Sequence, residues 1–446
     1  MKWLVRPREA LTVWTKIGLL SFGGPAGQIA LMHRIFVEEK RWIGETRYLH
    51  ALNFCMLLPG PEAQQLATYI GWLIGGRRGG ITAGTLFVLP GAIVMMGLSI
   101  LYARFAELPL LQGVFYGVKA AVVAVVIEAL LRIGKRALKT NFSRALAALA
   151  FVGIFFFAVP FPLIVLLAGI IGALSTKYFM SAPNQTSSKT ESEPLIDAAI
   201  DANALPYTAP KTSRTIITAL AGLFVWFAPL ALIAFATGQT SLYAQLGLFF
   251  SKMAVVTFGG AYAVLAYVAD QAVNAHHWLA PAQMLHGLGL AETTPGPLIL
   301  VLQFVGFLAA YRPHDSLAMG MFGASIALWA TFVPSILWIL VGAPYTEALR
   351  RIPALTAALA AITAAIVGVI LNLTVWFAIH ALFGTVGEAH FGLLRTLAPV
   401  WPSFDAIAAL IAVFAAIAML RLHWGMLPVL GLCAAAGAAL SLAGAI

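Results

Sequence analysis

Phe22-Gly23-Gly24 returns later in the sequence as Phe258-Gly259-Gly260, and Pro59-Gly60-Pro61 returns as Pro295-Gly296-Pro297. In both cases the second tripeptide follows the first by 236 positions. The same register pairs three single residues, namely Lys16 with Lys252, Trp42 with Trp278, and His50 with His286. After an eight-residue shift the match goes on, pairing Pro90 with Pro334 and Lys119 with Thr363. Unusual residues that recur in one register indicate two copies of one structural unit.

The composition predicts a membrane protein. Of the 446 residues, 61% are hydrophobic and 10% are charged, whereas a soluble domain carries roughly 25% charged residues. We therefore expect a polytopic membrane protein of the all-α class. The formal net charge of +10 fits the Lys and Arg of cytoplasmic loops, and no nucleic-acid partner is expected. The two cysteines lack the spacing of a zinc site or a disulfide, so no metal or other cofactor is predicted.

Hydropathy predicts about 13 transmembrane segments, each needing roughly 20 apolar residues. The apolar stretch 145–175 is divided by Val159-Pro160-Phe161-Pro162, so it is either one long bent helix or two short ones. The predicted domains are a first transporter repeat at 1–177, a flexible cytoplasmic linker at 178–213, an extra transmembrane segment at 214–240 and a second repeat at 241–446. Whether the copies are parallel or inverted depends on the number of spans: if each has six, the extra segment between them inverts the second copy.

The distribution of Lys and Arg favours the inverted topology. With the N-terminus in the cytoplasm, most basic residues fall on the cytoplasmic side, as the positive-inside rule requires. The cluster Arg132, Arg136 and Lys139 is assigned to that side. The loop 33–47, with four basic residues, is assigned to the outside, although it could equally lie along a membrane surface. The basic start runs into an apolar segment without a cleavage site, so we expect a plasma-membrane protein with a retained N-terminus.

The two repeated tripeptides predict discontinuous helices. Two successive glycines let the backbone leave a helix, and the helix that follows points unpaired N–H groups and a positive dipole end at an anion. The alternative for Phe-Gly-Gly is a closely packed helix face. Each proline of Pro-Gly-Pro removes a backbone donor, and unwound backbone inside a membrane is tolerated only around protein or a cavity. The alternative for Pro-Gly-Pro is a purely structural kink.

Charged residues in apolar segments are the next candidates, because each lysine at a helix centre costs ~2.5–3.5 kcal/mol. Lys16 and Lys252 are repeat equivalents and could face one cavity that suits a divalent anion, or they could snorkel to the membrane surface. Lys119 has only Thr363 as its counterpart. Glu128 is expected to pair with Arg132 at i+4 in a structural role. The two matched histidines are read as interfacial, with proton coupling as the alternative.

The substrate site is predicted to lie at mid-membrane between the copies, where inverted-repeat transporters bind their substrates. Polar residues beside the breaks would donate hydrogen bonds, and a buried Glu62 or Glu292 could carry a proton. The full set of predicted binding residues is Lys16, Phe22, Gly23, Gly24, Pro59, Gly60, Pro61, Gln64, Gln65, Lys252, Phe258, Gly259, Gly260, Thr294, Pro295, Gly296 and Pro297.

These motifs resemble the chromate ion transporter family in its long two-domain form. In the first half the likeness rests on Phe22-Gly23-Gly24-Pro25, on Pro59-Gly60-Pro61 with Gln65-Leu66-Ala67 and Tyr69-Ile70-Gly71, and on Ala83-Gly84 with Phe87-Val88-Leu89-Pro90-Gly91. In the second half it rests on Phe258-Gly259-Gly260, Thr294-Pro295-Gly296-Pro297 and Phe304-Val305-Gly306-Phe307. The resemblance implies chromate efflux driven by the membrane potential or a proton gradient. The long polar linker departs from the pattern.

The hypothesis is therefore a secondary active transporter that exports chromate, a small inorganic oxyanion, across a lipid bilayer. A transporter of sulfate or another inorganic anion, working in either direction, is the alternative within transport. A membrane-embedded enzyme or a scaffold is the alternative from another class. The chain lacks a nucleotide-binding loop, His-Glu-x-x-His and Gly-x-Ser-x-Gly, so no enzyme is predicted. Whether the protein forms a homodimer stays open at this point.

Overall fold

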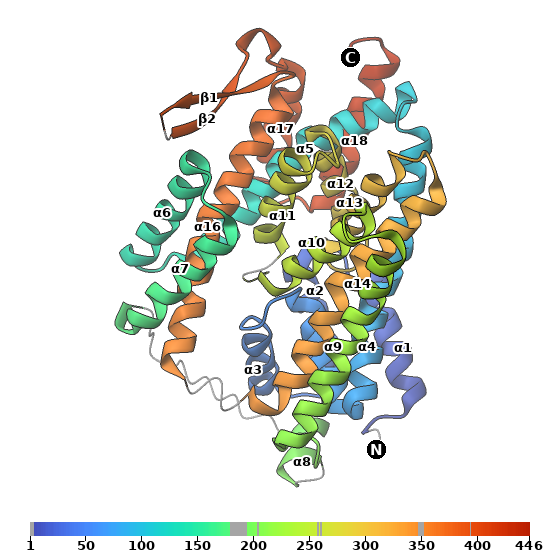
Figure 1. Ribbon diagram of the computed structural model, residues 1–446, viewed down its shortest axis with the longest axis vertical. Helices are drawn as coiled ribbons and strands as arrows, with labels where there is room; N and C mark the ends of the chain where they lie inside the picture. The colour runs from blue at the N-terminus through green and yellow to red at the C-terminus, as the bar shows by residue number, and fades with distance from the viewer. Residues whose placement is uncertain are drawn as a thin grey trace.

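The computed structural model describes residues 4–178, 194–202, 205–256, 258, 261–346, 352–392 and 394–446. The described chain is almost entirely helical (Figure 1). The first copy contains α1 (Pro7–Leu20), α2 (Gly24–His33), the π-helix η1 (Arg34–Glu39), α3 (Glu45–Cys55), α4 (Glu62–Phe105), α5 (Pro109–Ala137), α6 (Asn141–Phe157), α7 (Phe161–Leu174) and the 3-10 helix η2 (Thr176–Tyr178). Between the copies lie α8 (Leu195–Asp201) and α9 (Thr212–Thr237).

The second copy repeats this order with a different ending. It contains α10 (Leu242–Val256), α11 (Ala261–Asp270), the π-helix η3 (Gln271–Ala275), α12 (Pro281–Thr293), η4 (Leu298–Leu300), α13 (Val301–Tyr311), α14 (Leu317–Gly342), η5 (Ala343–Tyr345), α16 (Pro353–Leu382), η6 (Trp401–Ser403), α17 (Ala406–Leu420) and α18 (Met426–Leu442). An antiparallel hairpin of β1 (Val386–Phe391) and β2 (Leu394–Pro399) precedes η6, with Val386 opposite Pro399.

Five helices among the described residues are long and apolar enough to cross a membrane, namely α4, α5, α9, α14 together with η5, and α16. Six shorter apolar helices, each of 10–17 residues, accompany them among the described residues. The longest, α4, is two antiparallel helices joined at Gly75-Gly76, where the backbone leaves helical geometry. Its halves pack so closely that a Cβ on Gly71 would lie 2.5 Å from the Gly79 carbonyl oxygen. The polytopic α-helical fold predicted from composition is confirmed.

The two copies agree down to single hydrogen bonds. Phe22 N–H donates to the Leu20 carbonyl (2.9 Å) and Phe258 N–H to the Val256 carbonyl (3.0 Å). Trp42 N–H donates to Phe36 and Trp278 N–H to Ala272, across 2.8 and 2.7 Å. A π-helix precedes each tryptophan. The predicted repeat is therefore a structural one.

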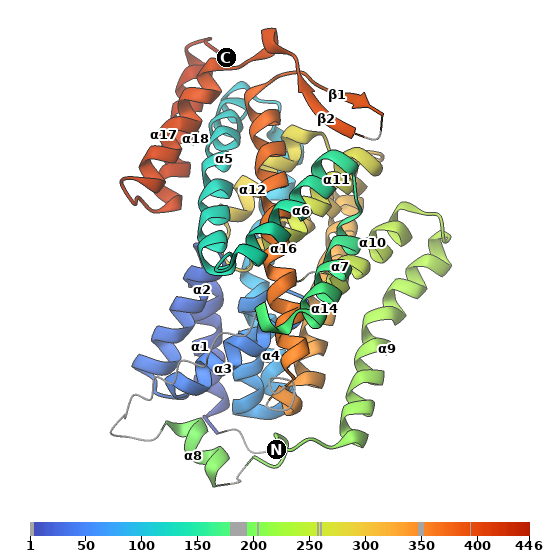
Figure 2. The ribbon, with the colours of Figure 1, turned by 90° about the vertical axis from the view of Figure 1, so that its left-hand side faces the viewer.

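The copies lie with opposite orientation. Ile196 of α8 donates its N–H to the Trp42 carbonyl (2.9 Å), whereas Trp278 accepts a bond from Arg312, just after α13 (3.1 Å). Figure 1 shows α8 and the N-terminus at the lower end, and α11, α12, α13 and the C-terminus in the upper half. Figure 2 shows the same arrangement from the side. The equivalent tryptophans therefore lie toward opposite ends of the molecule, as inverted repeats require.

The loop 33–47 lies on the N-terminal side, so its assignment to the opposite side was wrong. Lys40 Nζ pairs with Glu9 Oε1 at 2.8 Å, and Gly44 N–H donates to Asp197 Oδ2 of α8 at 2.7 Å. The cause is that α1 has only 14 residues, too few to cross a bilayer of about 30 Å. The chain turns back at Phe22-Gly23-Gly24, so α1 and α2 form a re-entrant pair.

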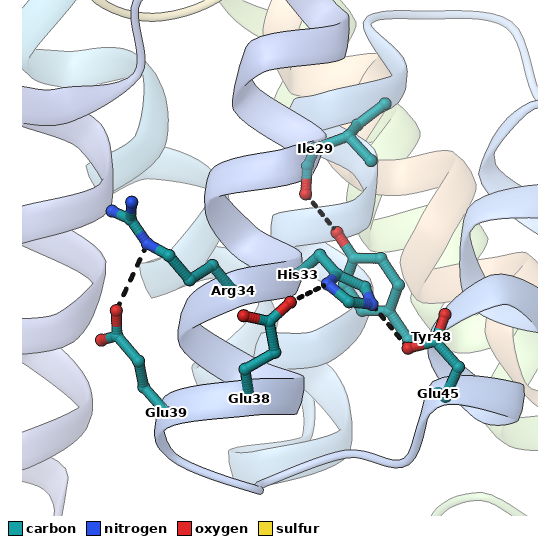
Figure 3. A network of polar contacts seen from close by, with 7 residues as sticks. All are labelled: Ile29, His33, Arg34, Glu38, Glu39, Glu45 and Tyr48. Carbon is teal, nitrogen blue, oxygen red and sulfur yellow. Dashed lines mark hydrogen bonds and ion pairs between the residues drawn. The ribbon is translucent and has the colours of Figure 1, made fainter. Parts of the chain in front are cut away.

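A polar network holds α2 against α3 on this side (Figure 3). His33 contacts Glu38 through Nδ1 (3.1 Å) and Glu45 through Nε2 (2.5 Å). Tyr48 OH donates to the Ile29 carbonyl (2.6 Å), and Arg34 pairs with Glu39 (3.3 Å). The acidic residues Glu38, Glu39 and Glu45 therefore bind His33 at the end of α2 and Arg34 at the start of η1.

Other sequence expectations have mixed outcomes. The stretch 145–175 forms two short helices, α6 and α7, separated around Ala158, which has a φ of 50°. The predicted flexible linker contains an ordered helix, α8, that docks through Asp197 and the buried Ile196. The sequence did not predict the β1–β2 hairpin.

Each Pro-Gly-Pro packs against the proline-containing helix of the other copy. Gly91 of α4 lies so close to Pro295 that a Cβ on Gly91 would approach the Pro295 carbonyl oxygen to 2.0 Å. Ser335 of α14 lies in the same way against Gly60, its Oγ only 2.8 Å from an ideal Cβ there. Gly91 and Ser335 are separated by 244 positions, the second register of the repeat. The two Pro-Gly-Pro segments and the helices that contain Pro90 and Pro334 therefore form one crossed arrangement.

This close approach predicts the effect of Gly91→Ala. Adding the methyl group forces α4 away from the unwound backbone, and overpacking of this kind costs about 1–3 kcal/mol. We expect a lower midpoint of thermal unfolding in detergent. Gly97→Ala in the same helix is the control, because no heavy atom lies within 4 Å of its ideal Cβ. Equal midpoints for the two variants would contradict the packing described here.

Candidate functional site

The break at Phe22-Gly23-Gly24 orients the N-terminus of α2 toward the interior. Gly23 and Gly24 adopt φ values of 86° and 68°, which side chains other than glycine rarely adopt. No heavy atom lies within 4 Å of an ideal Cβ on either residue. Conformation and not crowding therefore requires glycine here, and the first N–H groups of α2 are left without helical partners.

Gln28 joins this break to the Pro-Gly-Pro of the second copy. Its Nε2 donates to the Gly296 carbonyl at 2.5 Å and to the Ser21 carbonyl at 3.3 Å. Gly296 N–H in turn donates to the Ser21 carbonyl at 2.8 Å. All three residues are buried. The unwound backbones of the two copies thus share their hydrogen bonds.

The first Pro-Gly-Pro is held by the glutamines that follow it. Gln65 Nε2 donates to the Pro59 carbonyl at 2.7 Å. Ser335 Oγ of the second copy donates to Gln64 Oε1 at 2.6 Å. Both glutamines are fully buried. These side chains therefore stabilise the break and fasten it to α14.

A cavity of about 380 Å³ lies where the helix breaks of both copies meet. Pro25 and Ala26 line it from the start of α2, and their repeat equivalents Ala261 and Tyr262 line it from the start of α11. Glu62, at the start of α4, also lines it. The remaining lining residues are Ile29, Met56, Ala129, Arg132, Ile133, Arg136, Ala137, Lys139, Thr140, Ser143, Ala360 and Thr363.

The cavity wall is electropositive. Arg132, Arg136 and Lys139 come from the end of α5 and the turn after it. The N-terminal residues of α2, α4, α6 and α11 add partial positive charge, because helix N-termini carry unpaired N–H groups. Gly134, between the two arginines, lies against Val367 halfway along α16, with its ideal Cβ 3.7 Å from Val367 Cγ1. The basic end of α5 is therefore at the middle of a membrane-spanning helix, not at its end.

Two carboxylates, those of Glu128 and Glu62, reduce the positive charge of the cavity wall. Glu128 forms the predicted i+4 ion pair with Arg132, one turn from the cavity. Arg136 Nη2 contacts Met56 Sδ at 3.0 Å on the cavity wall, which Glu62 also lines. Glu62 attracts Arg136 across the cavity wall, but Arg136 forms no direct ion pair with a described residue, so its guanidinium is more accessible to an anion than that of Arg132.

Glu62 and Glu292 lie at or behind the cavity. Glu62 lines it directly. Glu292 is 3% exposed and accepts a hydrogen bond from Tyr262 OH at 2.6 Å, and Tyr262 is itself part of the wall. A carboxyl so placed can exchange a proton with the cavity through the tyrosine hydroxyl.

Lys16 and Lys252 lie elsewhere. Both side chains are exposed, and Lys16 faces an open groove on α1 with Leu19 and Leu20. Lys252 is flanked by Leu248 and Val255, which are 73% and 44% exposed. The structure does not bring either lysine into the cavity. The groove beside Lys16 is also lined by Arg8, Thr12 and Thr15, whereas Lys252 has exposed apolar neighbours. Because Arg132, Arg136 and Lys139 are exposed too, the two sets of cations differ in cavity lining and not in exposure.

The other predicted residues are spread between the breaks. Phe22 and Phe258 are partly buried. Thr294 is buried and donates to the Leu290 carbonyl at 2.7 Å. Pro59, Gly60, Pro61, Pro295, Gly296 and Pro297 form the unwound segments, while Gly259 and Gly260 lie outside the described residues. None of the residues in this paragraph lines the cavity in the described chain.

Sequence reasoning missed the basic end of α5, Tyr262, Gln28 and Ser21. The sequence did contain one indication of where the basic end of α5 lies. If 145–175 forms two short helices, they return to mid-membrane, and the basic cluster that precedes them must lie there too. Gln28 was visible as a single amide in an apolar segment, but nothing in the sequence indicated its partner.

Comparison with known proteins identifies one family and several related transporters. The sequence model of the family described as "Chromate transporter" matches residues 8–173 and 244–438. A "Chromate transport protein" of Pseudomonas aeruginosa is 32% identical over 363 residues, covering 80% of this chain and 77% of that protein. A "Chromate transport protein" of Cupriavidus metallidurans is 29% identical over 369 residues, covering 81% and 80%. No solved structure matches the chain.

Proposed function

Because the chain belongs to the chromate transporter family, we propose that it is a secondary active transporter that binds chromate in the cavity between its two copies. The observation that carries this proposal is the convergence of three cationic side chains and the N-termini of both α2 and α11 on one cavity. Relatives named for chromate transport support the substrate class.

The arrangement of cations and N–H groups on the cavity wall suits a tetrahedral dianion. Arg136 would bind one edge of the oxyanion with two parallel N–H groups, and Arg132 and Lys139 would add charge. Backbone N–H groups at the starts of α2 and α11 would satisfy further oxygens. The glutamines, Thr294 and the Pro-Gly-Pro segments would hold these helix ends in place. Charge compensation is thus assigned to α5 in place of the two surface lysines.

Transport would be outward, across the plasma membrane, with the N-terminus in the cytoplasm. The N-terminal side carries Arg77, Lys211 and Arg214 together near α8 and α9, which supports this orientation by the positive-inside rule. Glu62, or Glu292 through Tyr262, would take up a proton as the dianion leaves. Protonation of either carboxyl would then couple oxyanion movement to a proton gradient.

Sulfate is the competing substrate, because it has the same charge and shape and the cavity holds no group that separates the two. The test is uptake of labelled chromate and labelled sulfate into inside-out vesicles that contain the protein, with and without a proton gradient. We expect saturable chromate uptake that a gradient changes. Uptake of sulfate alone would assign the protein to sulfate, and movement of neither anion would favour an enzyme or a scaffold.

A further inference from the structure

The two copies contribute different parts of their equivalent helices to the cavity wall. Its wall includes Arg132 and Arg136 from α5, but not their counterparts Trp376 and His380 from α16. Conversely, it includes Thr363 of α16 but not the counterpart Lys119 of α5. Yet α5 begins at Pro109 and α16 at Pro353, the expected 244 positions apart. The two helices occupy equivalent positions in the repeat and have similar lengths, 29 and 30 residues. They differ in the residues that they present to the cavity.

Lys119 lies where this conformation has no described cavity. It precedes Arg132 by 13 residues, about 20 Å along α5, toward the end of the molecule away from the N-terminus. Its side chain is partly buried, and its Nζ lies 5.5 Å from the ring centre of Tyr116. Tyr116 OH donates to Asp405 Oδ1 at 2.6 Å. Among the described residues Lys119 forms no direct ion pair, and its charge is offset only in part by the Tyr116 ring and by the attraction of Asp405. A lysine within an apolar helix is a candidate functional residue.

Aromatic side chains fill the neighbouring space. Tyr102 of α4 packs edge-on against Phe115 and Phe304, with ring centres 4.9 and 5.1 Å apart. His286 of α12 stacks on Phe115 at 5.0 Å and is hydrogen-bonded to Tyr102 OH through Nδ1 at 2.9 Å. These rings come from four helices, α4, α5, α12 and α13. They pack together beside the first half of α5, whereas the cavity lies beside the C-terminal end of that helix.

In inverted-repeat transporters the two copies can exchange conformations, which moves access from one side of the membrane to the other. In such an exchange α5 adopts, relative to the cavity on the opposite side, the position that α16 now has relative to the present cavity. We propose that Lys119 is the anion-binding cation of the opposite-facing state, where it occupies the cavity wall at the position now held by Thr363. This inference rests on the proposed function. It assigns one cation to each side of the pathway, Arg136 to one and Lys119 to the other.

The test uses vesicles of both orientations that contain the full-length protein, with labelled chromate presented on either side. Lys119→Met should raise the half-saturating concentration roughly tenfold when chromate is presented opposite the N-terminus, since it removes one charged partner. On the N-terminal side the change should be less than about twofold. Arg136→Met should show the reverse pattern. Lys119→Arg should restore the wild-type value, and Lys135→Met is a control, because Lys135 is exposed on α5 and does not line the cavity.

Equal shifts on both sides, or no shift on either, would overturn the assignment of Lys119. Wild-type vesicles that move no chromate from either side would instead overturn the proposed function. If Lys119→Met fails to reach the membrane, Lys119→Cys gives a second measurement in a chain with Cys55 and Cys433 replaced by Ala. A membrane-impermeant thiol reagent should then modify residue 119 only from the side opposite the N-terminus. Modification from the N-terminal side would contradict the proposal.

Discussion

Arg136→Met is expected to reduce the rate of chromate transport at low substrate concentration by roughly tenfold to a hundredfold, because a hydrogen bond to a charged group contributes about 1.5–3 kcal/mol. Arg136 lines the cavity and contacts Met56 there. The charge of Arg132 is already balanced by Glu128, so Arg132→Met should have the smaller effect. Initial rates of labelled chromate uptake into vesicles, corrected for the amount of protein in the membrane, measure the difference.

Lys16→Met and Lys252→Met are the matched controls, since each also removes one cation from a membrane helix. Neither side chain lines the cavity, so transport should stay within about twofold of wild type. The result also decides between two hypotheses. Loss of transport in the lysine variants, with Arg136→Met unaffected, would return charge compensation to the repeat-matched pair.

The sequence identified the breaks because their cause is local. Proline lacks an N–H, and successive glycines permit positive φ, wherever they stand in a fold. The observed φ of 129° at Gly60 and 94° at Gly296 follows from this chemistry. Repeat symmetry then indicated that the breaks belong to two equivalent units. These inferences required no knowledge of how the helices pack.

Symmetry did not indicate which way a side chain faces. It paired Lys16 with Lys252, but the helix faces of both carry exposed apolar side chains. Leu19 and Leu20 follow Lys16 by three and four positions, the spacing that places side chains on one helix face. That pattern predicts a lipid-facing stripe as readily as a site. Helix facing is decided by contacts between distant segments, which a single sequence does not contain.

The error in the loop 33–47 has a similar origin. Hydropathy counted the first apolar segment, residues 11–32, as one of the predicted crossings. Two re-entrant half-helices and a full span have the same apolar content, so hydropathy does not distinguish them. Only the turn at Phe22-Gly23-Gly24 distinguishes them, and the length of α1 then fixes the side to which the chain returns. The same reasoning applies to the basic end of α5, whose depth depends on α6 and α7 being short.

Gln28→Met is expected to lower transport by roughly tenfold or more while the protein still folds, because the change removes the amide that joins the two unwound segments. Gln28 Nε2 donates to carbonyls of both Ser21 and Gly296, and each buried polar group left unpaired costs about 1–3 kcal/mol. The repeat counterpart of Gln28 is Val264, whose side chain has no amide, so repeat symmetry does not supply a second bridge of this kind. Its loss should free the start of α2 from the second Pro-Gly-Pro.

Gln303→Met separates this coupling from general destabilisation. Gln303 is also buried and donates a single bond to a carbonyl, that of Ala92 at 2.9 Å, but it does not touch Ser21 or Gly296. Both variants should lower the midpoint of thermal unfolding in detergent, since each removes a buried amide. Only Gln28→Met should also reduce initial rates of chromate uptake per folded molecule. A matching loss of transport in Gln303→Met would mean that Gln28 acts through stability alone, because the contact between the breaks would then carry no special weight in moving the anion.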